Sequence, residues 1–189
     1  AGSIFPAAGS ARDTKATDMT ATFHDLDSRS VFITGGGSGI GAALTEGFLR
    51  QGAKVAFVGR SDYRGFCDEM QEATGHRPLP IQCDITDVEA LRAAVAQASE
   101  AHGPVDVLVN NAANDDRHAT LDVDQAYWDS MQAINLRAYF FAAQAVLPGM
   151  REKGSGRIVN FTSASYLMGQ AGYPAYVTAN AGITGLTRG

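Results

Sequence analysis

Cysteine is scarce in this 189-residue sequence, and long apolar runs are absent. The two cysteines, Cys67 and Cys83, form no CxxC pair and lie near no histidine cluster. We therefore expect reduced thiols, a cytoplasmic protein and no metal site. No apolar run is long enough to cross a bilayer. The formal net charge of −5, from 15 basic and 20 acidic residues, argues against nucleic acid or an anionic membrane as a partner.

The N-terminal segment has little apolar character. Residues 1–22 consist mostly of Ala, Gly, Ser, Thr and Asp and lack an apolar core of signal-peptide length. We expect a disordered tail over 1–22, with Met19 as a candidate for the natural start. The remaining residues, 23–189, are enough for one folded domain with a sizeable core.

Strand-like and helix-like patterns alternate along the chain, which predicts an α/β fold with a doubly wound parallel sheet. A doubly wound sheet adds its strands outward, so the fifth strand would be an exposed apolar edge. We therefore expect the sheet to lack its last strands and the domain to be incomplete. The expected strands span Ser30–Thr34, Lys54–Val58, Leu79–Gln82, Val105–Val109 and Arg157–Thr162. The expected helices span Ile40–Gln51, a segment that follows a cap at Asp87, Asp124–Arg151, and a segment that starts at Tyr173.

A glycine-rich turn links the first strand to the first helix, over Thr34–Gly41. Gly35 permits a tight turn, Gly39 removes a side chain where a pyrophosphate must approach the backbone, and Gly41 allows the helix to pack against the strand. Free N–H groups at the helix N-terminus would face the phosphates. This arrangement predicts a Rossmann-type dinucleotide-binding domain. The candidate phosphate-binding residues are Gly35, Ser38, Gly39, Ile40 and Gly41.

Further motifs follow in a fixed order. The glycines are spaced Gly-x3-Gly-x-Gly, the sequence NNAA (110–113) follows the fourth strand, and Tyr176 follows the fifth. In this combination, from Ser30 to the end, the chain resembles the short-chain dehydrogenase/reductase family. The resemblance implies strand order 3-2-1-4-5 and an oxidoreductase that uses NAD or NADP on a small alcohol or carbonyl substrate. It also puts Ile85 and Asn110 at the cofactor.

The residue after the second strand bears on the choice between NAD and NADP. An acidic residue there would bind the ribose hydroxyls of NAD, whereas a basic residue favours the 2′-phosphate of NADP. The family's acidic position falls on Gly59 and Arg60 follows, which favours NADP. Asp84 resembles the family aspartate that accepts a hydrogen bond from the adenine amino group. From the sequence alone it is equally a turn or cap residue.

Three residues match the family's catalytic positions. Tyr176 lies 13 residues after Ser163, the family's spacing between tyrosine and serine. The resemblance makes Tyr176 the acid/base, Ser163 a hydrogen-bond donor to the same substrate oxygen, and Asn135 the holder of a water in a proton relay. The family lysine, four residues after the tyrosine, is replaced by Asn180. A lysine ammonium there would favour the phenolate form of the tyrosine, so we expect impaired catalysis.

A polar loop, NDDRH (114–118), follows the fourth strand, at the edge of the sheet where ligands bind in such folds. Asn114 and Arg117 are the candidate substrate residues, since amide and guanidinium groups suit a polyhydroxylated substrate. With the following AYWD (126–129), the string resembles the bacterial sugar dehydrogenases of the family, among them the D-xylose 1-dehydrogenases, which generally use NAD. NAD and NADP therefore both stay open.

Other functions fit parts of the sequence. A 3-oxoacyl-type ketone reductase shares the same motifs, and the loss of the lysine would suit a non-catalytic nucleotide-binding protein or an unstable fragment. Members of the family commonly pair their long helix across subunits, so the resemblance also implies a homo-oligomer, a dimer or a tetramer. The long helix carries more apolar side chains than one core face needs: Tyr139, Phe140, Phe141, Val146 and Leu147.

Overall fold

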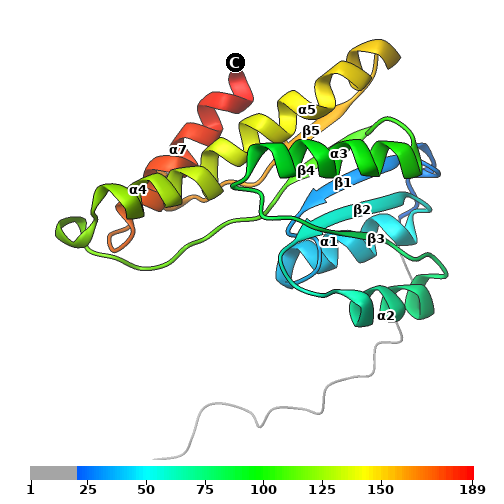
Figure 1. The fold of residues 1–189 in the computed structure, drawn as a ribbon, viewed down its shortest axis with the longest axis horizontal. Coiled ribbons are helices and arrows are strands. Elements are labelled where there is room, and N and C mark those ends of the chain that lie inside the picture. Colours follow the sequence, from blue (N-terminus) through cyan, green and yellow to red (C-terminus); the bar gives the residue numbers. More distant parts are fainter. Residues whose placement is uncertain (1–20) are drawn as a thin grey trace, which may run out of the picture.

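A computed structural model describes residues 21–189 of the chain (Figure 1). Met19 and all but the last two residues of the expected tail lie outside the described residues. The described part contains a five-stranded parallel sheet in the order β3-β2-β1-β4-β5, which confirms the predicted Rossmann-type topology. In chain order its strands are β1 Ser30–Thr34, β2 Lys54–Gly59, β3 Leu79–Gln82, β4 Val107–Asn110 and β5 Arg157–Asn160.

Helices cover both faces of this sheet (Figure 1). The helices α1 and α2 lie on one face and α3 and α5 on the other, while α7 packs against α4. The helices are α1 Gly39–Arg50, α2 Arg64–Thr74, α3 Val88–His102, α4 Gln125–Gln132, α5 Ala138–Lys153, α6 Ser165–Met168 and α7 Pro174–Arg188. Shorter turns are η1 His24–Leu26, η2 Thr120–Asp122 and the π-helical η3 Ala133–Arg137.

The alternation of side chains along the strands divides the core into two layers. In β1, Val31 and Ile33 pack with α1 and α2, whereas Phe32 packs with α3 and α5. All five residues of β1 are buried, because it is the central strand and both of its faces are covered by helices. The buried centre of the domain therefore lies directly beneath the glycine-rich turn that follows β1.

The predicted long helix exists but is not uniform. Asp124 caps its start by accepting a hydrogen bond from the Tyr127 amide at 2.7 Å. The π turn at 133–137 then interrupts the run between α4 and α5, and the last turn reaches Lys153. An apolar pattern with helical spacing cannot distinguish α from π geometry, so the interruption was not predicted. The predicted cap at Asp87 is confirmed, since its carboxylate accepts from the amides of Glu89 and Ala90.

Several strand and helix boundaries differ from the prediction, and one helix was not predicted. The fourth strand begins at Val107 instead of Val105, and it continues to Asn110. The fifth strand ends at Asn160 instead of Thr162, where the Thr162 hydroxyl turns toward α7 and donates to the Asn180 carbonyl oxygen at 2.9 Å. Helix α2 was not predicted, because its sequence is mostly polar and buries only Cys67 and Met70.

The outer strand β5 is the least covered part of the sheet within residues 21–189. Val159 in this strand is 44% exposed, as the expectation of an exposed apolar edge requires.

A separate finding concerns membranes: in the described part of the chain, every helix is too short or too polar to pass through a bilayer.

Candidate active site

The glycine turn is shaped by close contacts that only glycine permits. Gly35 and Gly39 have φ angles of +70° and +52°, in the left-handed region that glycine adopts at low cost. A Cβ atom at Gly41 would lie 1.9 Å from the Gly35 carbonyl oxygen, so the helix start packs directly on the turn. A Cβ at Gly39 would meet nothing within 4 Å. Gly39 therefore exposes its backbone to open space, as an approaching pyrophosphate requires.

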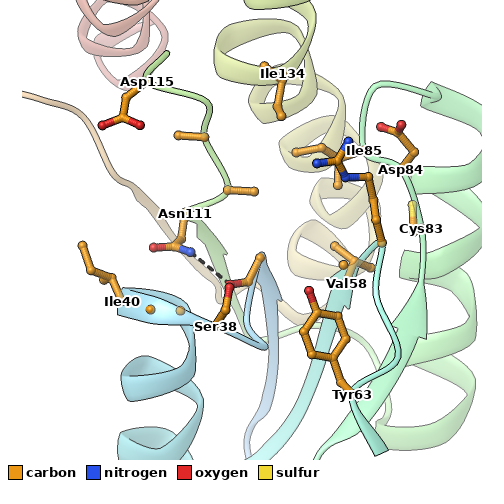
Figure 2. A pocket seen from close by; sticks show the side chains of 17 residues that line it. Ser38, Ile40, Val58, Tyr63, Cys83, Asp84, Ile85, Asn111, Asp115 and Ile134 are labelled. Atoms are coloured by element: carbon orange, nitrogen blue, oxygen red, sulfur yellow. Dashed lines mark hydrogen bonds between the residues drawn. The ribbon is translucent and has the colours of Figure 1, made fainter. Parts of the chain in front are cut away.

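A cavity of about 540 Å³ opens beside this turn, at the carboxyl ends of the strands (Figure 2). All five phosphate-binding candidates line it, together with Arg60, Asp84 and Ile85. The structure thus brings together eight of the nine predicted cofactor residues. The sequence analysis did not assign the other lining residues to the cofactor; they are Val58, Gly59, Tyr63, Cys83, Asn111, Ala112, Ala113, Asp115 and Ile134.

Tyr63 occupies the space next to the second strand. Its ring would contact a Cβ atom of Gly37 at 2.3 Å and one of Gly59 at 2.6 Å, so both glycines are needed to seat it. The ring packs edge-on against Phe57, with 5.3 Å between centroids. Figure 2 shows its hydroxyl group directed into the cavity. An acidic side chain at position 59 would have to displace this ring. The spacing of Tyr63, Cys67 and Met70, at four and three residues, was the available signal for it.

Asp84 and Cys83 line the wall of the cavity that lies across from the glycine turn (Figure 2). Hydrogen bonds from the amide and the hydroxyl of Thr86, at 2.9 and 2.8 Å, lower the pKa of Asp84 and keep the carboxylate ionised. Asp84 therefore forms a turn and also lines the cavity, and its hydrogen bond to the adenine amino group stays a prediction. Burial raises the pKa of the Cys83 thiol to about 11, with a further contribution from Asp84, so that this sulfur is a neutral wall atom.

The two asparagines at the end of β4, Asn110 and Asn111, have different surroundings. Asn110 is completely buried and donates to Asn160 Oδ1 at 2.9 Å, which ties β4 to β5 beneath the site. It is not among the residues that line the cavity. Asn111 lines the cavity and donates to the carbonyl oxygens of Thr34 and Gly35 at 3.1 and 3.3 Å, the second bond being drawn in Figure 2. Asn111 thereby fixes the glycine turn relative to β4.

Asn135 lies in the π turn and is 1% exposed. Its side chain accepts from the Asn114 amide at 2.9 Å and donates to the Asn114 carbonyl oxygen at 3.0 Å. It also donates to the Met131 carbonyl oxygen at 3.0 Å, which the π turn leaves within reach. Asn135 therefore clamps the start of the substrate-side loop through the backbone.

Ser163 and Tyr176 lie on segments that are joined to one another. The Ser163 hydroxyl accepts from the Ser165 amide at 3.2 Å, just after β5. Tyr176 lies in the first turn of α7, with its ring 5.2 Å from that of Tyr173. The bond from Thr162 to α7 holds the two segments together. None of the three catalytic candidates is among the residues that line the 540 Å³ cavity, so the structure does not bring them together with the cofactor candidates there.

Asn180 faces the protein interior and is 3% exposed. Its amide nitrogen donates to the Tyr176 carbonyl oxygen at 3.0 Å, one turn earlier in the same helix. Its amide oxygen accepts from the Thr162 hydroxyl at 3.2 Å. The side chain is thus engaged in local hydrogen bonds at the position where the family carries its lysine, and it brings no positive charge to Tyr176.

The loop that holds both substrate candidates lies against the start of α7. Asn114 forms a turn with Asp116, in which the Asp116 amide donates to Asn114 Oδ1 at 3.0 Å. The guanidinium carbon of Arg117 lies 3.9 Å from the centre of the Tyr173 ring, a cation–π contact. Arg117 also donates to the Ala171 carbonyl oxygen at 3.5 Å. Both candidates are therefore held by contacts within the chain, and Arg117 stacks on Tyr173, whose ring lies 5.2 Å from that of Tyr176.

Similarity to known proteins agrees with this geometry. A family model described as short chain dehydrogenase matches residues 29–189. A protein described as a probable galactose dehydrogenase, GalD, from Rhizobium meliloti is 51% identical over 88% of this chain and 66% of its own length. A D-xylose 1-dehydrogenase from Caulobacter vibrioides is 47% identical over 89% of this chain and 67% of its own length.

A solved structure has the same fold. It is described as that of a short-chain alcohol dehydrogenase from Sinorhizobium meliloti, and it superposes with a TM-score of 0.81 at 32% identity. The match covers 86% of this chain and 65% of the other. The chain thus spans about two thirds of the length of the relatives it matches.

Proposed function

Because the chain belongs to the short-chain dehydrogenase family, we propose that the protein transfers hydride between NAD(P) and a sugar or a related secondary alcohol. The observation that carries this proposal is the cavity of about 540 Å³ formed by the glycine turn and the ends of β2, β3 and β4. A flexible glycine loop would not need the contact between Gly41 and Gly35 that shapes the turn, whereas a dinucleotide site does.

The chain's own residues account for the proton transfers. The Tyr176 phenolate would take the proton from the substrate hydroxyl, and the Ser163 hydroxyl would donate a hydrogen bond to the same oxygen. Asn135 would keep the loop of Asn114 and Arg117 against the substrate, because it holds that loop by two backbone hydrogen bonds. When bound, the nicotinamide supplies the hydride acceptor. For a sugar oxidised at C1, loss of one proton and one hydride yields a lactone.

Asn180 limits this chemistry in the proposed mechanism. An acid/base tyrosine is most effective when its phenolate is accessible at neutral pH, and a nearby cation favours that form. Asn180 is neutral, and its amide is used by Tyr176 and Thr162. We therefore propose that the cofactor is bound well and used slowly.

A sugar is the preferred substrate class for two reasons. The two relatives with the highest identities above carry the names of galactose and D-xylose dehydrogenases. The loop after β4 offers amide, carboxylate and guanidinium groups, which donate to and accept from several hydroxyls. A 3-oxoacyl-type ketone reductase is the second candidate, since a reductase of that kind from Vibrio harveyi is 31% identical to the chain.

A panel of substrates tests the proposal. NAD and NADP are titrated into the purified protein. Formation of reduced nicotinamide is then followed with D-galactose and D-xylose, and consumption of added NADH or NADPH is followed with a 3-oxoacyl thioester. We expect saturable cofactor binding with slow sugar oxidation, which the Tyr176→Phe variant abolishes because the acid/base is lost. Faster turnover of the thioester would favour the reductase instead. Cofactor binding with no turnover of any substrate would indicate a non-catalytic nucleotide-binding protein.

Arg60 supports a preference for NADP in this proposal. It is exposed at the rim of the cavity, and Tyr63 excludes an acidic residue from position 59. A charge-assisted hydrogen bond contributes about 1.5–3 kcal/mol. We therefore expect Arg60→Ala to weaken NADP binding by about ten- to a hundredfold and to leave NAD binding nearly unchanged, as measured by calorimetry.

Arg64 provides the matched control for this experiment. It is an exposed arginine four residues further on, paired with Asp62 at 2.7 Å, and it does not line the cavity. Arg64→Ala should change neither affinity. Equal weakening of NAD and NADP by Arg60→Ala would contradict the NADP preference and leave a general effect of charge.

We also propose that the protein forms a homo-oligomer through α5. The outer face of α5 exposes Phe140 and Leu147, which are 48% and 43% accessible, whereas Tyr139 and Val146 are in the core. Exposed aromatic and aliphatic side chains on one helix favour a face that pairs with a second copy.

A further inference from the structure

The loop after β4 is docked on the start of α7 through His118. The His118 amide donates to the Gly172 carbonyl oxygen at 2.9 Å, and its ring packs edge-on against Tyr127 with 4.8 Å between centroids. The ring therefore lies between α4, which carries Tyr127, and the first turn of α7. In Figure 1 the green loop after β4 and the orange segment before α7 meet at the end of the molecule where α4 begins.

Ala175 is the residue that precedes Tyr176, and side chains from this region bind both its backbone N–H group and its backbone carbonyl group. The Ala175 amide donates to His118 Nε2 at 3.2 Å, and the Ala175 carbonyl oxygen accepts from Gln132 Nε2 at 2.9 Å. Ala175 itself is fully buried. These two bonds fix the backbone immediately before Tyr176, and they come from residues 57 and 43 positions away in the sequence.

The first turn of α7 depends on this arrangement, because it has little capping of its own. Tyr173 occupies the N-cap position and makes no side-chain cap bond, and Pro174 has no N–H group. Ala175 carries the next N–H, which needs an acceptor because it is buried. His118 Nε2 provides that acceptor, and so performs from a distant segment the role that a local Ser or Asp usually performs.

Hydrogen bonding determines which protonation state of the His118 ring can accept from the Ala175 amide. Nε2 must carry a lone pair to accept from the Ala175 amide, so the proton of a neutral ring must be on Nδ1. Two acceptors lie at that nitrogen, since the Asp116 carbonyl oxygen and the Tyr127 hydroxyl are each 2.9 Å from Nδ1. All three contacts are therefore consistent only with the neutral, Nδ1-protonated tautomer.

We propose that His118 is a positioning residue for Tyr176, anchoring the first turn of α7 through a neutral Nε2 atom and releasing that turn when the imidazole is protonated. The inference rests on the proposed function, in which Tyr176 is the acid/base. In imidazolium, Nε2 carries a hydrogen, so two N–H groups would face each other at the Ala175 amide. Protonation of the ring therefore removes the acceptor on which the Ala175 amide depends.

The charged and titratable groups around the His118 ring belong to three segments. The ring's own loop contributes Asp115, Asp116 and Arg117, and the start of α7 contributes Tyr173 and Tyr176. Two further groups come from the α4 segment, the capping carboxylate of Asp124 and the phenol of Tyr127. Slight burial and, to a smaller extent, the charge of Asp116 raise the pKa of Tyr127 above its ordinary value. This phenol therefore stays neutral at neutral and acidic pH.

Two variants of His118 separate the role of Nε2 from that of the rest of the ring. In His118→Gln the side-chain oxygen reaches the place of Nε2 and can accept from Ala175, whereas the shorter His118→Asn reaches only the place of Nδ1. The measurement is the hydrogen-exchange protection factor of the Ala175 amide by NMR, at pH 8 and pH 5, with ¹⁵N shifts of the His118 ring reporting its tautomer.

We expect the neutral ring to carry its proton on Nδ1, and the protection of Ala175 to fall under the conditions in which the ¹⁵N shifts show the ring to be protonated. His118→Asn should lower the protection at pH 8 by about tenfold, the effect of losing one helix cap. His118→Gln should keep it at both pH values. His118→Asn should also lower kcat, with KM for the cofactor changed by less than about twofold, because the displaced group acts on the substrate oxygen.

Failure of the anchor and failure of the proposed function give different results. A proton on Nε2 at pH 8, or equal protection of Ala175 in wild type and His118→Asn, would overturn the anchor whatever the activity. If the tautomer and the protection are as expected but Tyr176→Phe leaves turnover unchanged, the anchor stands as a structural contact and the catalytic assignment is wrong. If both hold while kcat of His118→Asn equals that of wild type, the positioning role is wrong.

Discussion

Replacing Asn180 with lysine is expected to raise the rate of sugar oxidation by about a hundredfold or more. A positive charge within about 4–6 Å lowers the pKa of an acidic group by about 1 to 3 units, so a lysine ammonium would make the phenolate at position 176 much more abundant at neutral pH. Asn180 is one helical turn from Tyr176 and already contacts its carbonyl oxygen at 3.0 Å. The measurement is kcat at saturating cofactor, for wild type and Asn180→Lys.

The longer side chain introduces a complication, because Asn180 is 3% exposed and its amide is hydrogen-bonded to Thr162 and Tyr176. Lysine can bury its methylene groups and direct its ammonium toward the solvent-filled side of the helix. Asn180→Met, which has similar length and no charge, is the matched control and should stay as slow as wild type. A high wild-type rate that Asn180→Lys leaves unchanged would contradict the impaired-catalysis proposal.

The cofactor part of the site could be predicted because its chemistry lies in one short segment. The glycines at 35, 39 and 41 act through the backbone conformation of their own turn, so sequence spacing was enough to find them. Tyr63 acts through packing against Gly37 and Gly59, which are far from one another in the sequence. Nothing in the local pattern relates these three residues, and only the sheet brings them together.

The catalytic candidates show which features the sequence alone does not predict. The catalytic roles of Ser163, Tyr176 and Asn135 are predicted by resemblance and stay predictions. The hydrogen bonds of these residues could not be predicted, because they depend on how loops pack. Asn135 clamps Asn114 through a π turn that apolar periodicity cannot detect. His118 was considered only as part of the polar loop 114–118, and its bond to Ala175 spans 57 residues. Side chains that bind backbone across such separations need three-dimensional structure to be identified.

Adding a single methyl group at Gly41 is expected to abolish cofactor binding. The Cβ atom of Gly41→Ala would lie 1.9 Å from the Gly35 carbonyl oxygen and 2.8 Å from the Asn111 amide nitrogen. The first contact is with backbone, so the turn has to move, and the N–H groups aimed at the pyrophosphate move with it. We expect affinity for NAD(P) to fall at least about a hundredfold and the free energy of unfolding to fall by about 1–3 kcal/mol. Calorimetric titration and urea denaturation measure the two effects.

Gly47 in the same helix is the matched control. A Cβ at this position would meet nothing within 4 Å, and alanine favours a helix over glycine by about 0.5–1 kcal/mol. Gly47→Ala should therefore stabilise the protein slightly and leave cofactor affinity unchanged. The contrast isolates the effect of the turn from that of helix propensity, because the chemical change is identical. Full cofactor affinity in Gly41→Ala would mean that the dinucleotide does not bind at this turn, and the proposed function would lose its main support.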